Sequence, residues 1–405
     1  MPILRLKKYL GIREIGENLD FSRQDVSYFD FSNFSILPTN INKFQPIVTI
    51  LESGWIIDGR FVITDDGSVI GEGFNWSEAG IGVVIIAQNK KLKVKENSNT
   101  LSIKGFSNDE GPQSVIREID NDEIANSIFV SGFNNLSHFM MEIAPKTILV
   151  PLILPKYPSI NKSIILSDLV PKKWIDYCLN TASSIDKSNF DLSIKQINSD
   201  KAIRFKNILV ISSTSYKDSE NKINMSVNQA KFFSMQMCKN AFSTTDGKPY
   251  IIYLSRKNAA HRKTLNQENL IVIIKKIFPN FNLIVEDEIH KLSMEDQAKL
   301  IYNAKLVIEE GGGSTGFVSN LIGNNSVYVT IQTAQRQLDA AKLYLAGLNK
   351  YAAWIFGEPV GELTESLVVD NDIIVDESKF ERLMIQVSLF VLGKFPMPII
   401  GDKIK

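Results

Sequence analysis

Cysteine and histidine are scarce in this chain of 405 residues, which contains only two cysteines and three histidines. Cys178 and Cys238 form no Cys-x-x-Cys pair and belong to no cysteine–histidine cluster. The histidines, His138, His261 and His290, show none of the spacings typical of metal ligands. This pattern supports neither a disulfide framework nor a zinc site, and it favours a reducing compartment.

Net charge is absent as well, because 45 lysines and arginines balance 45 aspartates and glutamates. A balanced chain argues against a nucleic-acid-binding protein that relies on bulk positive charge. A local basic groove for a phosphate-bearing ligand remains compatible with this composition.

Long apolar runs are missing too, since we find no stretch of about 18 apolar residues that predicts a membrane span. The first residues, MPILRLKKYLGIREIG, lack the apolar core of a signal peptide. We therefore expect a cytoplasmic protein. Residues 3–10, ILRLKKYL, form either a short basic amphipathic segment at the inner face of the cell membrane or an ordinary first helix with a solvated face.

The composition is that of a globular protein, with 44% apolar and 22% charged residues, and the length allows two domains. Residues 1–200 read as a strand-rich domain. The stretch GWIIDGRFVITDDGSVIGEG alternates apolar and polar residues around Asp-Gly turns, which predicts a hairpin. Later, NNLSHFMMEIAPKTILVPLILPKYP is helical in period, and PKKWIDYCLNTA predicts a helix that Pro171 opens.

Residues 201–360 alternate short apolar strands with helices, which predicts a parallel sheet covered on both faces. Ser293, followed by Asp296 three residues later, predicts a helix start. Residues 361–405 form a third part, a C-terminal helical segment that contains SKFERLMIQVSLFVLGK. The fold class is therefore α/β.

Two arginines, Arg256 and Arg262, lie in the loop after the apolar strand YIIYLS. Ligands of open parallel sheets bind beyond the carboxyl ends of the strands, and two guanidinium groups there suit a diphosphate. The alternative is a pair of solvated surface arginines. The next such loop, EDEIHKL, carries Glu288, which either binds a ribose or sugar hydroxyl or faces water.

A third loop follows the strand LVIEE and contains Gly311, Gly312, Gly313 and Ser314, with a helix expected from Thr315. A glycine loop at a helix start exposes backbone N–H groups to an anion. It matches neither a P-loop nor the dinucleotide-binding fingerprint. The loop is therefore either a place where a diphosphate or sugar approaches the backbone or a tight structural turn.

Three blocks of this sequence together resemble glycosyltransferase family 61. The segment NNLSHFMMEIAPKTILV resembles the family pattern N-x-x-H-x-x-x-E-x-x-P, and YLSRKNAAHRKTLNQENL resembles its block with two arginines. The third block runs from LSMEDQAKL through the glycine-rich turn, where family members commonly have His-Gly-Ala and this chain has Gly-Gly-Ser. The matching positions are Asn135, His138, Glu142 and Pro145, then Ser255, Arg256, Arg262, Asn266 and Gln267, then Glu295, Gln297, Gly311–Ser314 and Asn320.

The resemblance implies a GT-B-like arrangement, in which two Rossmann-like domains face each other across a cleft. Residues 1–200 would be the acceptor-side domain and residues 201–360 the nucleotide-sugar-binding domain. It also implies inverting transfer of a hexosyl or pentosyl group with no bound metal and no cofactor besides the nucleotide-sugar donor.

An inverting transferase needs a base for the acceptor hydroxyl and positive groups for the leaving diphosphate. His138 and Glu142 stand one helical turn apart and are the expected catalytic pair, with Glu309 and Glu310 as rivals. The residues expected to bind substrates are Asn135, Arg256, Arg262, Asn266, Glu288, Gln297, Glu310, Gly311, Gly312, Gly313, Ser314 and Asn320.

Richness in lysine, isoleucine and asparagine suggests a bacterial source, where the resemblance points to capsule or O-antigen polysaccharide synthesis. The partners would be a nucleotide sugar and a glycan or lipid-linked glycan acceptor. Two other functions stay open, a non-catalytic protein that binds glycans or sugar nucleotides and a glycan phosphotransferase. The sequence does not indicate an oligomeric state.

Overall fold

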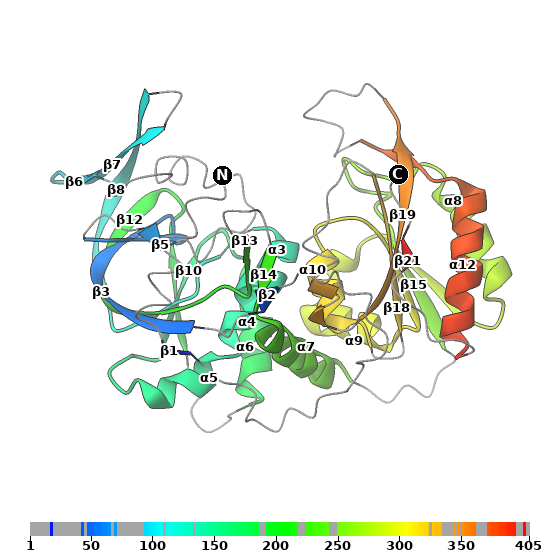
Figure 1. Ribbon diagram of the computed structural model, residues 1–405, viewed down its shortest axis with the longest axis horizontal. Helices are drawn as coiled ribbons and strands as arrows, with labels where there is room; N and C mark the ends of the chain where they lie inside the picture. The colour runs from blue at the N-terminus through cyan, green and yellow to red at the C-terminus, as the bar shows by residue number, and fades with distance from the viewer. Residues whose placement is uncertain are drawn as a thin grey trace. The chain divides into compact units, whose positions relative to one another are not determined.

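The chain divides into two compact units after Phe233 (Figure 1). The computed structural model describes residues 17–18, 42–43, 47–65, 69–70, 93–107, 111–132, 134–185, 192–217, 223–242, 249–323, 326–333, 344–345, 347–348, 350–361, 371–393 and 400–401. Residues 3–10, where we expected a possible membrane contact, lie outside them. Each unit is described here by itself.

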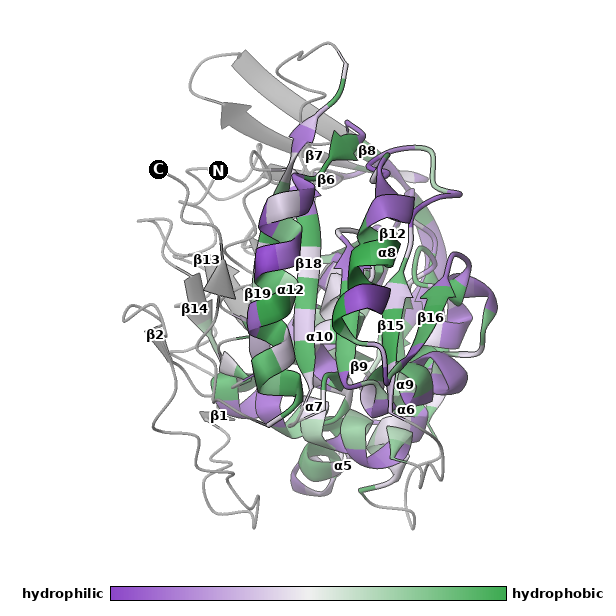
Figure 2. Ribbon diagram, turned by 90° about the vertical axis from the view of Figure 1, so that its right-hand side faces the viewer, coloured by the Kyte–Doolittle hydropathy of each residue, from purple (hydrophilic) through white to green (hydrophobic). Residues whose placement is uncertain are grey.

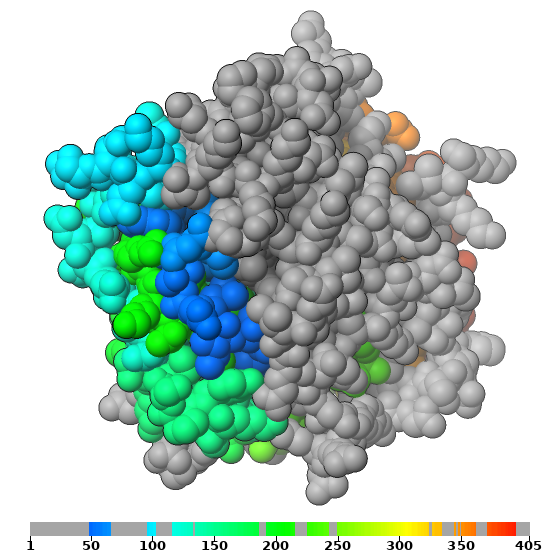
Figure 3. Space-filling view, turned by 60° about the vertical axis from the view of Figure 1, so that its left-hand side comes forward, coloured from blue at the N-terminus to red at the C-terminus, as the bar shows by residue number. Residues whose placement is uncertain are grey.

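In the described residues, unit 1 contains a mixed sheet of eleven strands. Strand β12 (Lys201–Ile211) pairs with β3 (Ile47–Ile57) in antiparallel fashion and with β8 (Gly111–Ala125) and β9 (Ile128–Phe129) in parallel. In Figure 3 the blue residues of β3 and β4 accordingly lie beside green residues of β12. Its other strands are β1 (Glu17–Asn18), β4 (Phe61–Thr64), β5 (Val69–Ile70), β6 (Lys93–Glu96), β7 (Thr100–Ser107), β10 (Ser163–Ser167) and β11 (Ser193–Ile197).

A small second sheet of unit 1 joins β2 (Asn42–Lys43), β13 (Ser215–Lys217) and β14 (Ile223–Met225). Because β12 belongs to the large sheet, the units divide after Phe233 and not near residue 200, where we placed the boundary. Helix α7 (Val227–Ala241) begins in unit 1 and ends in unit 2.

The predicted hairpin is present as the antiparallel pair β3–β4. Three residues, Asp58–Arg60, connect the strands, because Ile57 pairs with Phe61. Asp58 and Gly59 are the central residues of a β-turn, with φ angles of 56° and 63°, and the N–H of Arg60 donates to the carbonyl of Ile57. Positive φ at both central residues defines the type I′ turn that matches the twist of paired strands, and Asp-Gly is a preferred sequence for it.

The helical run predicted after residue 135 is present and begins at α3 (Leu136–His138). It continues through a π-helical turn, η3 (Phe139–Ile143), into α4 (Ala144–Thr147), α5 (Val150–Ile153) and the 3₁₀ turn η4 (Leu154–Lys156). By length and composition the run Leu136–Lys156 is apolar enough to cross a membrane, but its most apolar window is 78% buried in the structure. That degree of burial is typical of a core helix of a soluble protein. Helix α6 (Lys172–Ser183) follows Pro171, as predicted.

Unit 2 is built on a sheet with the strand order β16-β15-β17-β18-β19. These strands are β16 (Asn282–Glu286), β15 (Tyr250–Leu254), β17 (Leu306–Glu310), β18 (Val327–Thr333) and β19 (Tyr351–Pro359), and all are parallel, as predicted. Along the chain this is the order 2-1-3-4-5 of doubly wound folds. The short strands β20 (Ile373–Ile374) and β21 (Ile400–Gly401) both pair with β19.

Helices cover both faces of this sheet, as expected for parallel strands. Helices α8 (Gln267–Ile277) and α12 (Glu377–Val391) lie side by side across one face (Figure 2). On the other side are α9 (Met294–Asn303) and α10 (Thr315–Leu321) (Figure 1), and the turn η5 (Ile289–Lys291) precedes α9. Ser293 caps α9 by accepting the N–H of Asp296 at 3.0 Å, as predicted.

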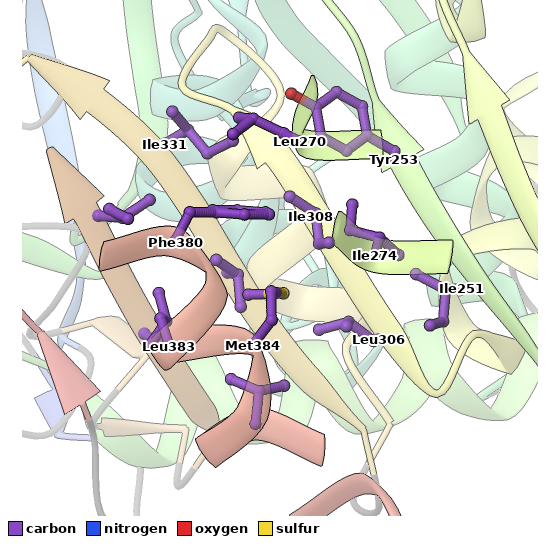
Figure 4. Packing of buried hydrophobic residues seen from close by; sticks show 14 of the residues in the cluster. Ile251, Tyr253, Leu270, Ile274, Leu306, Ile308, Ile331, Phe380, Leu383 and Met384 are labelled. Atoms are coloured by element: carbon purple, nitrogen blue, oxygen red, sulfur yellow. The ribbon is translucent and has the colours of Figure 1, made fainter. Parts of the chain in front are cut away.

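The core of unit 2 includes the C-terminal helix, so residues 361–405 do not form a part of their own. Phe380, Leu383 and Met384 of α12 pack toward Ile308 of the sheet and Ile274 of α8 (Figure 4). Burying a side chain such as that of Phe380 contributes about 1.5–3 kcal/mol. The observed architecture is thus mixed α/β, and unit 2 is a doubly wound parallel sheet.

Candidate functional site

The carboxyl ends of β15 and β17 mark the point where the strand order of unit 2 reverses. Strand β15 is the first along the chain, and its neighbours β16 and β17 lie on opposite sides of it. Helices that follow such neighbouring strands cover opposite faces, so their loops part and leave a crevice in which ligands bind. Arg256 follows β15 and Gly311 follows β17, so the predicted arginine loop and glycine loop both lie at this position.

Glu310 joins these two loops from within the protein. Its Oε1 accepts from the hydroxyl of Tyr253 at 2.8 Å, and its Oε2 accepts from the backbone N–H groups of Arg256 at 3.0 Å and Thr264 at 3.3 Å. Burial raises the pKa of the Glu310 carboxyl, and these hydrogen bonds lower it in part. We predicted Glu310 to bind substrate, but the structure engages both of its oxygens in holding the ends of the Arg256–Thr264 loop.

The three glycines have different surroundings. A Cβ on Gly311 would lie 2.7 Å from Cγ of Gln332, and one on Gly312 would lie 2.6 Å from Nη1 of Arg256. At Gly313 no atom of the described residues lies within 4 Å of the corresponding position. A larger residue in place of Gly311 would therefore clash with Gln332 and with the backbone of Ile331, whereas at Gly312 it would meet only the flexible end of Arg256.

The close approach at Gly312 places the Arg256 guanidinium directly against the glycine loop. Arg256 also donates from Nε and Nη2 to the carbonyl of His261, at 3.3 and 3.1 Å. A planar guanidinium held from one side by a carbonyl is pre-organised for a second bidentate contact with phosphate oxygens.

Glu309, the other rival for the catalytic base, is buried and hydrogen-bonded inside unit 2. It accepts from the hydroxyls of Ser314 and Tyr328. Ser314, which we predicted to contact substrate, directs its hydroxyl to this carboxylate. Helix α10 begins at Thr315, as predicted.

Arg262 lines a hollow beside the glycine loop. The residue has a φ of 62°, a left-handed conformation that is uncommon outside glycine and is often found at functional positions. The hollow is small, with a cavity volume of about 10 Å³, which is room for about one water molecule. Its lining consists of Arg262, Gly311, Ile331, Gln332, Thr333, Asn371 and Ile373.

The C-terminal segment holds the Arg262 side of this hollow in place. The N–H of Lys263 donates to Oδ1 of Asp372 at 2.9 Å, and the N–H of Ile373 donates to the carbonyl of Lys263 at 2.8 Å. Sequence reasoning missed Gln332, Thr333 and Asn371. Gln332 and Thr333 are the last residues of β18, Asn371 stands two residues before β20, and no motif marks any of them.

Three further predicted residues serve the structure of unit 2. Asn266 exchanges hydrogen bonds with the backbone of Val375, and Gln297 donates to the carbonyl of Leu292 at 2.9 Å. The buried Asn320 donates to the carbonyl of Gly316. Its side-chain Oδ1 accepts the hydroxyl of Tyr344 at 2.9 Å, and its backbone carbonyl accepts the hydroxyl of Ser234 at 2.7 Å, so the residue is held within the core.

Glu288 is exposed beyond the end of β16, where Lys291 contacts it at 2.7 Å. This contact holds the pKa of Glu288 below its usual value. The contacts of Glu288, Asn266, Gln297 and Asn320 are thus all to the protein itself.

In unit 1, Asn135, His138 and Glu142 lie together at the start of the helical run. Oδ1 of Asn135 accepts the N–H of His138 at 3.2 Å and caps α3. Nδ1 of His138 lies 2.9 Å from Oε1 of Glu142, one turn later. The Glu142 side chain is 1% exposed and that of His138 25% exposed, so a buried carboxylate supports a more accessible imidazole.

This pair lies at the carboxyl ends of parallel strands of unit 1. The carbonyl of Glu142 accepts the Ser213 hydroxyl at 3.1 Å, just beyond β12. The fully buried Lys146, one turn after Glu142, donates from Nζ to the carbonyl of Val130, just beyond β9. Sequence reasoning missed Lys146, although a lysine inside an apolar helical run and one turn from Glu142 was a visible signal.

A metal site has no candidate ligands in the part of the chain that the structure describes. Among those residues, no group of three or more His, Cys, Asp or Glu side chains lies together. Metal independence itself stays a prediction.

Residues 136–315 match the family model Glycosyltransferase 61, which confirms the resemblance over this segment. No curated protein matches the chain. One similar solved structure is the dodecameric iron-containing heptosyltransferase TibC in complex with ADP-D-beta-D-heptose, at 10% identity over 89% of this chain and 97% of that chain, with a TM-score of 0.29. Another is the TibC glycosyltransferase from enterotoxigenic E. coli H10407, at 10% identity over 88% and 94%, with a TM-score of 0.30. TM-scores of this size do not establish a shared fold.

Proposed function

On the premise that residues 136–315 belong to glycosyltransferase family 61, we propose that this glycosyltransferase moves a hexosyl or pentosyl group from a nucleotide sugar to a glycan, with inversion and without a metal. The observation that carries the proposal is the contact of Arg256 with Gly312 at the switch point of unit 2. There the guanidinium and the open backbone at Gly313 suit the donor diphosphate.

In this proposal unit 2 stabilises the leaving group, which is the nucleoside diphosphate. As the bond from the anomeric carbon to the diphosphate breaks, negative charge grows on the diphosphate oxygens. Arg256 offsets that charge in a partly buried position, where electrostatic stabilisation is stronger than in water. Glu310 acts as a positioning residue, because it holds the loop on which Arg256 is carried.

The acceptor side is assigned to unit 1. With Nδ1–H donating to Glu142, His138 presents Nε2 as the proton acceptor for an acceptor hydroxyl. The hydroxyl oxygen attacks the anomeric carbon from the face opposite the diphosphate, its proton passes to Nε2, and the nucleoside diphosphate departs. Glu142 orients the ring and stabilises the imidazolium that forms.

The setting of the reaction belongs to the same proposal. It comprises a GT-B-like arrangement of the two units, a cytoplasmic location, peripheral contact with the inner membrane face, and a lipid-linked or free glycan acceptor in capsule or O-antigen synthesis. The support is the family match together with the doubly wound sheet of unit 2.

The test is thermal stabilisation by a panel of nucleotide sugars, with Mg²⁺ and with EDTA, on the wild type and on Arg256→Lys. A specific donor at one hundred times its Kd stabilises the protein by about 2.7 kcal/mol. We expect one donor to stabilise the wild type equally with and without Mg²⁺, and Arg256→Lys to need a higher donor concentration. Arg382→Lys, at an exposed arginine of α12, is the matched control. A folded wild type that responds to no donor would refute the proposal.

A further inference from the structure

A cluster of buried polar side chains lies beside the His138–Glu142 pair of unit 1, where strand β12 ends. The N–H of Thr214 donates to the carbonyl of Glu142 at 3.4 Å, and the carbonyl of Thr214 accepts the N–H of Ser226 at 2.7 Å. Gln229 follows Ser226 by three residues, so the two stand on the same side of the first turn of α7. The buried polar cluster thus consists of Glu142, Thr214, Ser226 and Gln229, which come from three separate segments.

Five polar atoms of this cluster are not satisfied by the fold. Glu142 is 1% exposed, and the other three residues are fully enclosed. Within the residues that the structure describes, the atoms without a hydrogen-bond partner are Oε2 of Glu142, the hydroxyls of Thr214 and Ser226, and both Oε1 and Nε2 of Gln229. Buried polar groups of folded proteins are almost always paired, so five such atoms in one place indicate a hydrogen-bonding group that the protein encloses.

The start of α7 does not use these atoms as a helix cap. Residues 226–229, SVNQ, have the pattern of a capping box, in which the serine hydroxyl and the glutamine side chain each accept the backbone N–H of the other residue. In the structure the N–H of Ser226 donates to Thr214 instead, and neither side chain of the box has a partner among the described residues. Both side chains are therefore free to bind a different group.

The chemistry of the five atoms identifies that group as water. Oε2 of an ionised Glu142 and Oε1 of Gln229 accept hydrogen bonds, whereas Nε2 of Gln229 donates and the two hydroxyls do either. Only a group that both donates and accepts satisfies them all. A sugar hydroxyl would need an opening to reach residues that are closed to solvent, but enclosed water does not, and buried water typically makes about three hydrogen bonds to such polar groups.

Resting on the proposed function, we infer that three members of this cluster are positioning residues, which act through enclosed water to hold the carboxylate of Glu142 ionised and directed at His138. They are Thr214, Ser226 and Gln229. A buried carboxylate keeps its charge only where hydrogen bonds surround it. Oε1 of Glu142 has the imidazole at 2.9 Å, and Oε2 obtains its donors from the cluster. With that charge in place the neutral imidazole carries its proton on Nδ1, which leaves Nε2 to accept the proton of the acceptor hydroxyl.

Two variants of Thr214 separate its hydroxyl from its packing. Thr214→Val removes the hydroxyl at nearly constant volume, so it should keep the Tm and lower kcat about tenfold, the effect of one lost hydrogen bond to a charged group, with KM unchanged. Thr214→Ser keeps the hydroxyl and loses a buried methyl group, so it should lower the Tm and keep kcat. Thr181→Val is the matched control in the same unit, because that hydroxyl already donates to the carbonyl of Tyr177 at 2.9 Å. Its kcat should equal that of the wild type.

Nitrogen-15 NMR of the histidine side chains tests the inference without a substrate, since the chain has only three histidines. His138 of the wild type and of Thr214→Ser should carry its proton on Nδ1, and Thr214→Val and Gln229→Leu should show a mixture of both tautomers. Variants that all keep the wild-type tautomer and kcat would overturn the inference, and so would a kcat that follows the Tm across the series. A wild type that transfers no sugar would refute the proposed function instead, and the tautomer of His138 would still decide the inference.

Discussion

At the scale of single residues, the pair of His138 and Glu142 makes a kinetic prediction. The carboxylate of Glu142 is buried 2.9 Å from Nδ1 of His138, so its charge acts on the imidazole and not on the donor. Glu142→Gln keeps the shape and removes the charge that stabilises the imidazolium. We expect kcat to fall by roughly 10²–10⁴-fold, the usual range for general-base catalysis, with the donor Kd unchanged.

Steady-state kinetics together with calorimetric titration of the donor separate these two effects. Asp176→Asn is the control, because that carboxylate of α6 is exposed and paired with Lys172 at the same i, i+4 spacing. A Glu142→Gln enzyme with full kcat, or with lost donor binding and normal kcat, would contradict the assignment.

Residue types at the site were visible in the sequence, but their roles were not. Glu310 and Asn320 carry groups that suit sugar hydroxyls, yet both are directed inward because backbone N–H groups and buried hydroxyls need partners of the same chemistry. In contrast, Asn371 lines the hollow but gave no signal, because it meets the Arg262 loop only in the folded chain. Lys263 and Asp372, which join these segments, are 109 residues apart in sequence.

At the scale of elements, the glycine loop offers two matched variants. A Cβ at position 312 meets the flexible end of Arg256, so Gly312→Ala should leave the Tm nearly unchanged and push the guanidinium away from the loop. Donor affinity should then fall about tenfold, as expected for losing a hydrogen bond to a charged group.

Gly313→Ala is the informative partner variant, because its new Cβ has no neighbour within 4 Å among the residues that the structure describes. If the donor passes close to the backbone there, affinity falls and the Tm of the free protein does not. Equilibrium titration and thermal melts of both variants provide the measurement. Full donor affinity in both variants would exclude this loop from the donor site.

Helix α12 makes a prediction about pH. Asp376 caps it by accepting the N–H of Lys379 at 3.0 Å, and this bond lowers the pKa of the carboxyl from its ordinary 3.8. Because the folded state binds the proton more weakly, the contribution of Asp376 to stability is present above pH 3.8 and is lost as the pH falls through the lower, folded-state pKa.

Asp376→Asn keeps a capping oxygen that does not titrate. Denaturant melts of the wild type and Asp376→Asn should show the wild type losing stability relative to the variant only below about pH 3.8. Asp376→Ala should be less stable than both at neutral pH. If the difference in unfolding free energy between the wild type and Asp376→Asn does not change with pH, the cap is not formed in solution.

The elements of unit 2 were predictable because short apolar strands alternate with helices of amphipathic period. Strand β17, with the sequence LVIEE, and the preceding helix α9, which Ser293 caps, are an example. The hairpin at Asp58 and Gly59 was equally predictable, since Asp-Gly suits two successive positive φ angles. The π-helical turn at Phe139–Ile143 was not predictable, because one additional residue in a turn leaves an apolar pattern almost unchanged.

At the scale of the whole molecule, the division into units was the least accessible to sequence reasoning. Strand β12 is an apolar run that suits a parallel sheet of either unit, and only its pairing with β3 assigns it to unit 1. Similarly, α12 follows a long stretch without predicted elements, yet its buried face completes the core of unit 2.

Because α12 belongs to the core of unit 2, a cavity created beneath it should destabilise unit 2 more than unit 1. Phe380 is fully buried, so Phe380→Ala should cost about 3–5 kcal/mol. Hydrogen exchange should show lost amide protection in β15, β17 and β18, with smaller changes in β3 and β12. Ile385→Ala, at a position of the same helix that is 48% exposed, should change little. Equal loss of protection in both sheets would contradict the division into two units.

The central claim is that this molecule transfers a sugar and releases a nucleoside diphosphate. The most direct measurement identifies the products formed from the donor that binds best, with a glycan acceptor and EDTA present, by mass spectrometry and NMR of the anomeric proton. We predict a nucleoside diphosphate and a glycoside of inverted configuration. Release of a nucleoside monophosphate would show transfer of a sugar phosphate, and a bound but unchanged donor would show a binding protein, and either result would contradict the account.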